Sequence, residues 1–198
     1  MTEKQFQAFD SFRSAFKKEV QRWSSAAQNL SSLQALTAAE GKVPFYPVEN
    51  PVVYNTALDA ISKEDEIRLL VIGDNPGKEE QLSKNQKYLV GLAGKIGEKF
   101  FRENPELAVD FRKNAIILNK TPVHSAKTAM LYKIAKSSVE AENLIKESQI
   151  WMAEATARLH NELCSEALKN NLYVPQLWLV GYGELKPKGI FSAYTQTL

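Results

Sequence analysis

The stretch RLLVIGDNPGKEEQ, residues 68–81, contains an apolar run that breaks off into five turn-forming residues. The run is LLVI, residues 69–72, and a short apolar segment bounded by turn residues is typical of a strand buried on both faces. The following GDNPG, residues 73–77, places Pro76 and Gly77 where a type II turn takes a proline and a glycine of positive φ. The stretch predicts a buried strand followed by a tight turn, which is either purely structural or a catalytic loop.

Two further segments have the same pattern, NAIILN at residues 114–119 and QLWLVG at residues 176–181. Between them, residues 138–170 keep their apolar side chains at helical spacing. Strands that alternate with helices indicate right-handed crossovers around a parallel sheet, so we expect a three-layer α/β/α fold with a short, mainly parallel central sheet. Because ligands bind at the carboxyl ends of such strands, the three segments that follow the strands should converge on one crevice.

Helices are also predicted before and between these strands. Near the N-terminus, apolar residues recur every three or four positions and predict one long amphipathic helix. They are Phe6, Phe9, Phe12, Phe16, Val20, Trp23, Ala27 and Leu30. Residues 41–55 contain three prolines and should form an ordered, extended loop, whereas residues 56–66 and 88–104 should be helical. We expect a single domain over residues 1–198, in which residues 1–40 pack on the core as the N-terminal helix.

The composition of the chain excludes several classes of protein. Its 198 residues are 44% hydrophobic, enough for one core, and a formal net charge of +2 neither requires nor excludes a polyanionic partner. The single cysteine, Cys164, excludes an intramolecular disulfide and cannot hold an iron–sulfur cluster; we expect it inside a helix, and we expect no metal or cofactor. Without a signal-peptide pattern or a run of about 18 apolar residues, a cytoplasmic protein with no membrane partner is expected. The oligomeric state stays open.

The glycine-containing turn is not a phosphate-binding Walker loop. Such a loop has four residues between its first glycine and a Gly-Lys pair, and a serine or threonine follows the pair. Here three residues separate Gly73 from Gly77, and Glu79 follows Lys78. Any chemistry of the turn must come from Asp74 and Asn75, unless Asp74 only caps the next backbone amides.

Four segments, taken in order, resemble the motifs of the uracil-DNA glycosylase superfamily. They are VIGDNPGKEEQ, YLVGLAGKIGEKFF, IILNKTPVH and LWLVGYG, and the resemblance covers residues 57–183. The layout is most similar to the family 4-like branch, and the GxNPG loop is similar to that of the mismatch-specific members. The resemblance implies a uracil-DNA glycosylase-like fold that hydrolyses the N-glycosidic bond of uracil, or of another deaminated base, in DNA during base-excision repair.

The resemblance also implies roles for residues that follow the strands. Asn75 would position the attacking water, and Asp74 would act as a general base or stabilise the cationic sugar. Asn119 would offer its side-chain amide to the edge of uracil, unless it only bonds to its own loop. The remaining residues of the implied substrate-binding loop are Gly73, Pro76 and Gly77.

Other residues near the crevice match the family less closely. The family has an aromatic residue before Val-Gly, but this chain has Leu89 there, so stacking on the flipped base would come from Tyr88 if it occurs. His124 is a candidate proton donor or phosphate contact, with a plain loop histidine as the alternative, and His160 should lie on a helix surface or in the core. Several lysines fall near the expected crevice and could neutralise phosphates, with an ordinary soluble surface as the alternative: Lys78, Lys84, Lys87, Lys120, Lys127, Lys186 and Lys188.

The chain departs from the family in two further ways. It lacks the four cysteines of the iron–sulfur branch, and we find no match to the histidine-containing second motif or to the strand that precedes it. We therefore expect the fourth strand to be missing or truncated, and activity to be weak or absent. The alternative to a DNA glycosylase is a catalytically weak or inactive nucleic-acid- or nucleobase-binding member of the same fold. A third possibility is an unrelated α/β enzyme that binds a small anion at helix N-termini.

Overall fold

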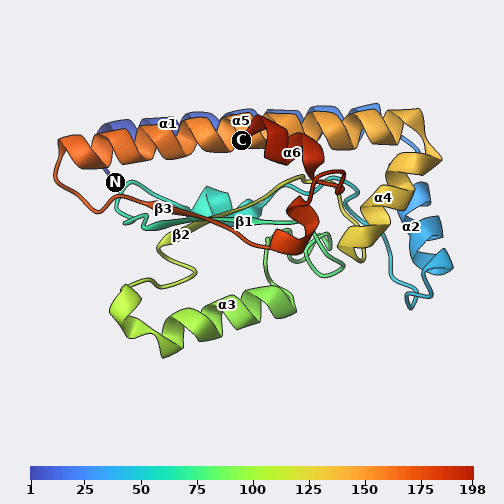
Figure 1. Ribbon diagram of the computed structural model, residues 1–198, viewed down its shortest axis with the longest axis horizontal. Coiled ribbons are helices and arrows are strands. Elements are labelled where there is room, and N and C mark those ends of the chain that lie inside the picture. The colour runs from blue at the N-terminus through green and yellow to red at the C-terminus, as the bar shows by residue number, and fades with distance from the viewer.

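A three-stranded parallel sheet lies at the centre of the protein (Figure 1). The computed structural model describes residues 1–198, except for the side chain of Tyr182. Strand β1 (Leu69–Gly73) lies between β2 (Ala115–Asn119) and β3 (Gln176–Leu179), and both neighbours run parallel to it. The three predicted strands are thus confirmed, although β3 ends before Gly181, which adopts a left-handed φ of 74°. The register places Gly73 beside Asn119 at the carboxyl ends of β1 and β2.

Helices cover both faces of this sheet, as predicted for a small α/β fold. Helices α1 (Glu3–Ala26) and α5 (Val139–Lys169) lie side by side over one face, and α3 (Leu92–Glu103) lies on the other (Figure 1). Both α4 (Thr128–Ser137) and the short C-terminal α6 (Ser192–Thr197) pack on α5, while α2 (Leu30–Glu40) packs on α4. Within the described part of the chain, no helix is both long and apolar enough to cross a membrane.

The N-terminal segment forms two helices where one was predicted. Helix α1 starts at a capping box between Thr2 and Gln5 and buries the predicted stripe from Phe9 to Trp23. It ends at Ala26, and Leu30, the last member of the stripe, begins α2 instead. The residue before α2 is Asn29, whose φ of −92° and ψ of 0° are not helical, and asparagine is a poor helix former because its side chain competes for backbone hydrogen bonds.

Two other helix predictions were too long. The predicted helix over residues 56–66 is a single 3₁₀ turn, η1 (Thr56–Ala60), and the one over residues 88–104 begins only at Leu92. The reason in the second case is Leu89, whose left-handed φ of 54° cannot be part of a right-handed helix. Further 3₁₀ turns are η2 (Pro105–Leu107) and η3 (Tyr182–Leu185). The long helix predicted over residues 138–170 is confirmed as α5, although Leu168, one of the apolar residues at helical spacing in that range, is exposed.

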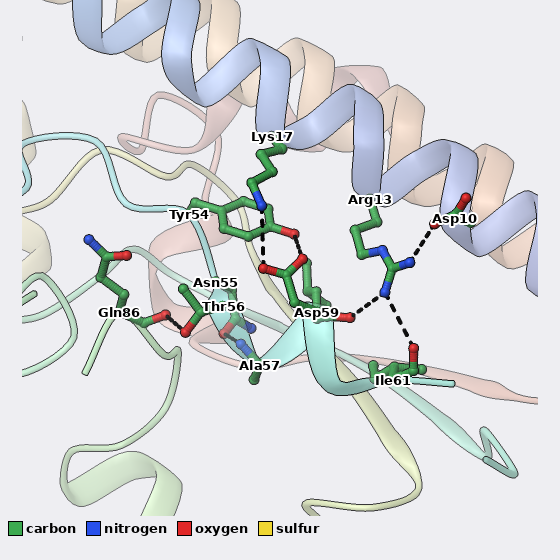
Figure 2. A network of polar contacts seen from close by, with 11 residues as sticks. Asp10, Arg13, Lys17, Tyr54, Asn55, Thr56, Ala57, Asp59, Ile61 and Gln86 are labelled. Carbon is green, nitrogen blue, oxygen red and sulfur yellow. Dashed lines mark hydrogen bonds and ion pairs between the residues drawn. The ribbon is translucent and has the colours of Figure 1, made fainter. Parts of the chain in front are cut away.

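The segment that contains η1 ties α1 to the sheet (Figure 2). Arg13 of α1 donates to the carbonyl oxygens of Leu58 and Ile61, at 3.2 and 3.3 Å. On the other side, the Asn55 amide donates to the carbonyl of Ile117 in β2 at 2.8 Å and accepts from the backbone of Tyr88 at 3.3 Å. The segment therefore fixes the position of the turn that precedes α3, which borders the strand ends.

Truncating the centre of the α1 interface should destabilise the whole domain. Phe16 is fully buried, with ring centroids of Tyr54 and Trp151 at 5.5 and 5.8 Å. We expect Phe16→Ala to lower the free energy of unfolding by about 3–5 kcal/mol in urea titrations, through lost burial and a residual cavity. The control is Phe45→Ala, because Phe45 is 96% exposed. This substitution should change the free energy of unfolding by less than about 0.5 kcal/mol. Equal unfolding midpoints for the two variants would contradict the assignment of α1 to the core.

Candidate functional site

The carboxyl ends of all three strands are joined by one side chain, that of Lys120. Its backbone N–H, directly after β2, donates to the carbonyls of Gly73 and Asp74 at 2.9 and 3.1 Å. Its ammonium group forms an ion pair with the Asp74 carboxylate and donates to the carbonyl of Val180, after β3, at 2.6 Å. The predicted convergence of the three strand ends is therefore confirmed.

The ion pair between Lys120 and Asp74 has one buried and one partly exposed end. The Lys120 side chain is 0% exposed and that of Asp74 is 22% exposed. Burial lowers the pKa of Lys120, while the hydrogen bond and charge of Asp74 act in the opposite direction. The ammonium also lies 5.0 Å from the centroid of the Phe191 ring. The prediction that Lys120 contacts phosphate is wrong, because this lysine is buried and its ammonium bonds to Asp74 and Val180 inside the protein.

Two further neighbours fix the Asp74 carboxylate. Thr128, the first residue of α4, donates its hydroxyl to Oδ2 at 3.5 Å. Gly181 packs against the same carboxylate so closely that a Cβ at this position would collide with it. Asp74 is therefore held by contacts from α4 and from the segment after β3, and it does not simply cap its own turn.

The Asn75 amide is oriented by three oxygens of the protein. Its Nδ2 donates to Ser125 Oγ at 2.9 Å and lies 3.2 and 3.4 Å from the carbonyl oxygens of Pro76 and Val123. Because carbonyl oxygens only accept hydrogen bonds, the amide must turn its NH₂ group toward them. Its Oδ1 accepts no hydrogen bond from the part of the chain that the structure describes. An acceptor is thus left free at a half-buried position next to Asp74.

Asn119 is a buried amide without a partner. The residue is 1% exposed, and neither Oδ1 nor Nδ2 has a hydrogen-bond partner among the described residues. Its Oδ1 packs against Gly73, the register partner in β1, where a Cβ would collide with it. A buried polar group that loses its hydrogen bonds costs about 1–3 kcal/mol, so such groups are rare and point to a missing partner. The alternative that Asn119 bonds to its own loop is wrong.

Leu89 lies on the same side of β1 as Asn119. Its Cδ2 would be 3.5 Å from a Cβ at Gly73. Its left-handed backbone is held by Arg112, which donates to the Leu89 carbonyl at 2.6 Å, and by the close approach of Gly94 to that carbonyl. Leucine rarely adopts this conformation, which needs support from its surroundings. The half-buried Leu89 side chain is therefore placed next to the unpartnered amide by contacts from α3 and the segment before β2.

The turn after Asn75 is not of type II. Gly77 does not have the predicted positive φ, and its carbonyl accepts from the backbone N–H groups of Glu80 and Gln81 at 3.2 and 3.3 Å. The Glu80 carboxylate in turn accepts from the Gly77 N–H at 3.1 Å, as in a helix capping box. Glu80 is 7% exposed, and burial raises its pKa. The chain therefore enters a helical turn that is closed by Glu80. The spacing of the glycine, proline and acidic residues in the sequence did not distinguish this helical turn from a type II turn.

Tyr88 and His124 are structural residues in this arrangement. Tyr88 is 1% exposed and donates its hydroxyl to the Val53 carbonyl, so the expectation that it stacks on a base is wrong. His124 is 0% exposed, with Nδ1 2.9 Å from the Pro76 carbonyl and Nε2 2.9 Å from the Tyr46 hydroxyl. The carbonyl requires a proton on Nδ1, so Nε2 accepts from Tyr46. Burial lowers the pKa of His124 to about 4, which leaves it neutral at pH 7 and unsuited to donating a proton or binding phosphate.

The remaining residues singled out in the sequence lie outside this group. His160 on α5 is half-buried and bonds to the Pro175 carbonyl at 2.9 Å, in agreement with a helix role, and Cys164 lies half-buried one turn later. Six of the predicted lysines are exposed: Lys78, Lys84, Lys87, Lys127, Lys186 and Lys188. Among the described residues, no three His, Cys, Asp or Glu side chains come together as metal ligands would.

Sequence reasoning missed four residues that shape the site. Glu80 had a usable signal, because an acidic residue three positions after a turn glycine fits a capping box. Tyr46, Ser125 and Thr128 had none, because each acts through a contact with a residue 50 or more positions away.

The fold and the site define a small α/β protein with polar side chains gathered at the carboxyl end of a parallel sheet, the position of the expected crevice. Comparisons of the chain with known protein families, with curated proteins and with solved structures found no match. The resemblance to uracil-DNA glycosylases therefore rests on the motifs, and the function has to be argued from the geometry of the crevice.

Removing one partner of the buried ion pair should be more harmful than removing both. We expect Asp74→Ala to lower the free energy of unfolding by about 3 kcal/mol, because it leaves the Lys120 ammonium buried and unpaired. The double variant Asp74→Ala/Lys120→Met should recover most of this loss. Glu3→Ala, which breaks an exposed ion pair with Lys63, should have no measurable effect. A double variant that is less stable than Asp74→Ala in urea titrations would contradict this account.

His124 should make the protein sensitive to mild acid. Its pKa is lower in the folded state than the ordinary 6.5, so its contribution to stability is complete above pH 6.5 and is lost as the pH falls toward about 4. From pH 7.5 to pH 5 this histidine should remove about 2 kcal/mol from the free energy of unfolding. Urea titrations across this range should show a flatter dependence for His124→Gln, whereas Asn161→Gln, at an exposed position on α5, should follow the wild type. Identical slopes for wild type and His124→Gln would rule out this assignment.

Proposed function

We propose that this protein is uracil-DNA glycosylase-like and hydrolyses the N-glycosidic bond of uracil, or of another deaminated base, in DNA. The observation that carries the proposal is the unpartnered amide of Asn119, buried at the end of β2. An amide that lacks both a donor and an acceptor partner calls for a ligand that supplies both in adjacent positions. The edge of uracil does so, through its N3–H donor and its neighbouring carbonyl acceptor.

The surroundings of Asn119 suit a flat ring. Gly73 has no side chain, so its backbone allows close approach on the β1 side of the amide. Leu89 is the neighbouring apolar side chain, at the position where the family has an aromatic residue. Since Asn119 is 1% exposed, a base that reaches the amide must displace neighbouring side chains, and Leu89 is an apolar neighbour on this side of β1. A flipped base offers both the hydrogen-bonding edge and the apolar face that this arrangement needs.

Hydrolysis would use the residues on the other side of the turn. The free Oδ1 of Asn75 is an acceptor that can orient a water molecule toward the sugar carbon C1′. As the water attacks C1′ and its proton is released, the bond to the base breaks and the base departs as an anion that is then protonated. The adjacent Asp74 carboxylate would stabilise the positive charge that develops on the sugar.

The alternative function is binding of the base without turnover. It is favoured by one observation, the ion pair in which the Lys120 ammonium offsets the charge of the Asp74 carboxylate. A neutralised pair stabilises a cationic sugar less than a free carboxylate would. The two functions share the same base-binding site and differ in whether the glycosidic bond is cleaved, so experiments can separate them by measuring binding and cleavage.

The first test is cleavage of uracil-containing DNA. Single-stranded and mismatched double-stranded substrates are incubated with the protein, and abasic sites are cleaved with alkali. We expect wild type to produce uracil-dependent cleavage and Asn119→Ala to reduce kcat/KM by roughly 10²-fold, because the base loses its hydrogen bonds. Asn75→Ala should reduce cleavage while leaving binding of the DNA unchanged. The matched control is Asn161→Ala, an exposed position on α5, with every variant checked for folding by urea titration.

The outcomes distinguish the two candidates. Binding of uracil-containing DNA that Asn119→Ala weakens, without cleavage by any form, would support the binding function and reject the hydrolase. Cleavage or binding that is equal in wild type and Asn119→Ala would reject the role given to the amide. Absence of both activities would reject both functions.

A further inference from the structure

Among the described residues, Phe45 is the most exposed large apolar residue, with 96% of its surface accessible to solvent. Burial of a phenylalanine side chain stabilises a fold, and the exposed Phe45 makes no such contribution. A single exposed apolar residue is common on protein surfaces, so its exposure alone indicates no function. Phe45, however, lies in a segment whose neighbours are fixed on both sides.

The segment is held in place from Tyr46 onward, the residue after Phe45. Tyr46 turns inward and bonds through its hydroxyl to His124, with the two rings edge to face at a centroid distance of 5.6 Å. Successive side chains of an extended segment point to opposite sides, so an inward Tyr46 directs Phe45 outward. Pro47 accepts a hydrogen bond from Gln81 at 2.9 Å, and Gln81 also accepts from the backbone of Glu49 at 2.7 Å.

On the N-terminal side the segment is held as well. The backbone N–H of Val43 donates to the carbonyl of Ala38 in α2 at 2.9 Å. Pro44 directly precedes Phe45 and Pro47 follows two positions later, and each proline fixes its own φ. The phenylalanine is thus presented to solvent by a segment with little freedom to bury it.

The segment lies next to the proposed base-binding crevice. His124, which receives the Tyr46 hydroxyl, bonds through its other nitrogen to the carbonyl of Pro76 in the turn after β1. Lys78, two residues further along this turn, places its ammonium 5.9 Å from the centroid of the Tyr46 ring. A lysine cation therefore lies against the residue next to Phe45, and both belong to segments bonded to the turn after β1; a base and a phosphate of one strand offer partners of these two kinds.

We propose that Phe45 is a stacking platform for a neighbouring base of the DNA strand whose flipped base enters the crevice. The inference rests on the proposed function, because it needs DNA at the crevice. A base pulled from its stack leaves its neighbours with an uncovered face, and an aromatic side chain covers such a face whatever the sequence. Stacking on one aromatic residue accounts for roughly 5- to 100-fold in affinity, and it is sequence-tolerant.

The test measures, by fluorescence anisotropy, how tightly the protein binds a fluorescein-labelled oligodeoxythymidylate with one central uracil. We expect Phe45→Ala to bind roughly tenfold more weakly than wild type, and Phe45→Trp to bind as wild type does. In Phe45→Trp the added tryptophan fluorescence should be quenched by the oligonucleotide, which reports stacking directly. The matched control is Leu168→Ala, a 67% exposed apolar residue near the C-terminal end of α5, which should leave affinity unchanged.

The outcomes separate this inference from the proposed function. If Phe45→Ala binds and cleaves like wild type, the platform is rejected and the glycosylase proposal stands. If binding depends on Phe45 but not on the uracil or on Asn119, the platform stands and the proposed function is rejected. No DNA binding by wild type rejects both. Self-association that Phe45→Ala abolishes, without any effect on DNA binding, would assign the ring to contacts between copies of the chain and reject the platform.

Discussion

The crevice depends on a buried lysine that joins the ends of three short strands. Strands of four or five residues leave few backbone hydrogen bonds to fix where each one ends. Lys120 supplies this constraint by reaching Asp74 after β1 and Val180 after β3. Burial of an ammonium group is tolerated only when its hydrogen bonds are satisfied, so both contacts are required together. The conformation of the turn after β1 is thereby coupled to the segment after β3.

Strand geometry then separates two kinds of residue in the crevice. Asn119 and Lys120 are consecutive, and consecutive side chains at a strand end point to opposite sides. Lys120 faces Phe191 and the Asp74 carboxylate, whereas Asn119 faces Gly73. The first side is fully paired and stabilises the fold, while the second keeps an amide without partners. A ligand or a water molecule that hydrogen-bonds to that amide would offset its cost of about 1–3 kcal/mol.

The sequence predicted what depends on local periodicity and failed where distant contacts decide. Apolar runs located the three strands, and three- and four-residue spacing located α1 and α5. The crevice was predicted because the carboxyl ends of parallel strands meet, which placed Asp74, Asn75 and Asn119 together. Tyr88 was misassigned because its burial depends on the carbonyl of Val53, 35 positions away. Lys120 was misassigned because its partner Val180 is 60 positions away, directly after another strand. No local pattern carries such information.

The ion pair also determines which charges the crevice presents. Its exposed end is the carboxylate of Asp74, and its ammonium end is buried behind it, so the pair acts on the crevice as an oriented dipole with the negative end outward. A dipole favours positive charge on a sugar, but its effect falls off faster with distance than that of a free carboxylate. Catalysis at this site would therefore depend more on Asn75 than on Asp74. The neutral amide of Asn75 can orient the attacking water but cannot remove its proton. A hydrolase built on this site would depend on the positive charge of the sugar to acidify the attacking water as the bond breaks. Its rate would then be limited by departure of the base, and recognition by Asn119 would matter more to function than proton transfer.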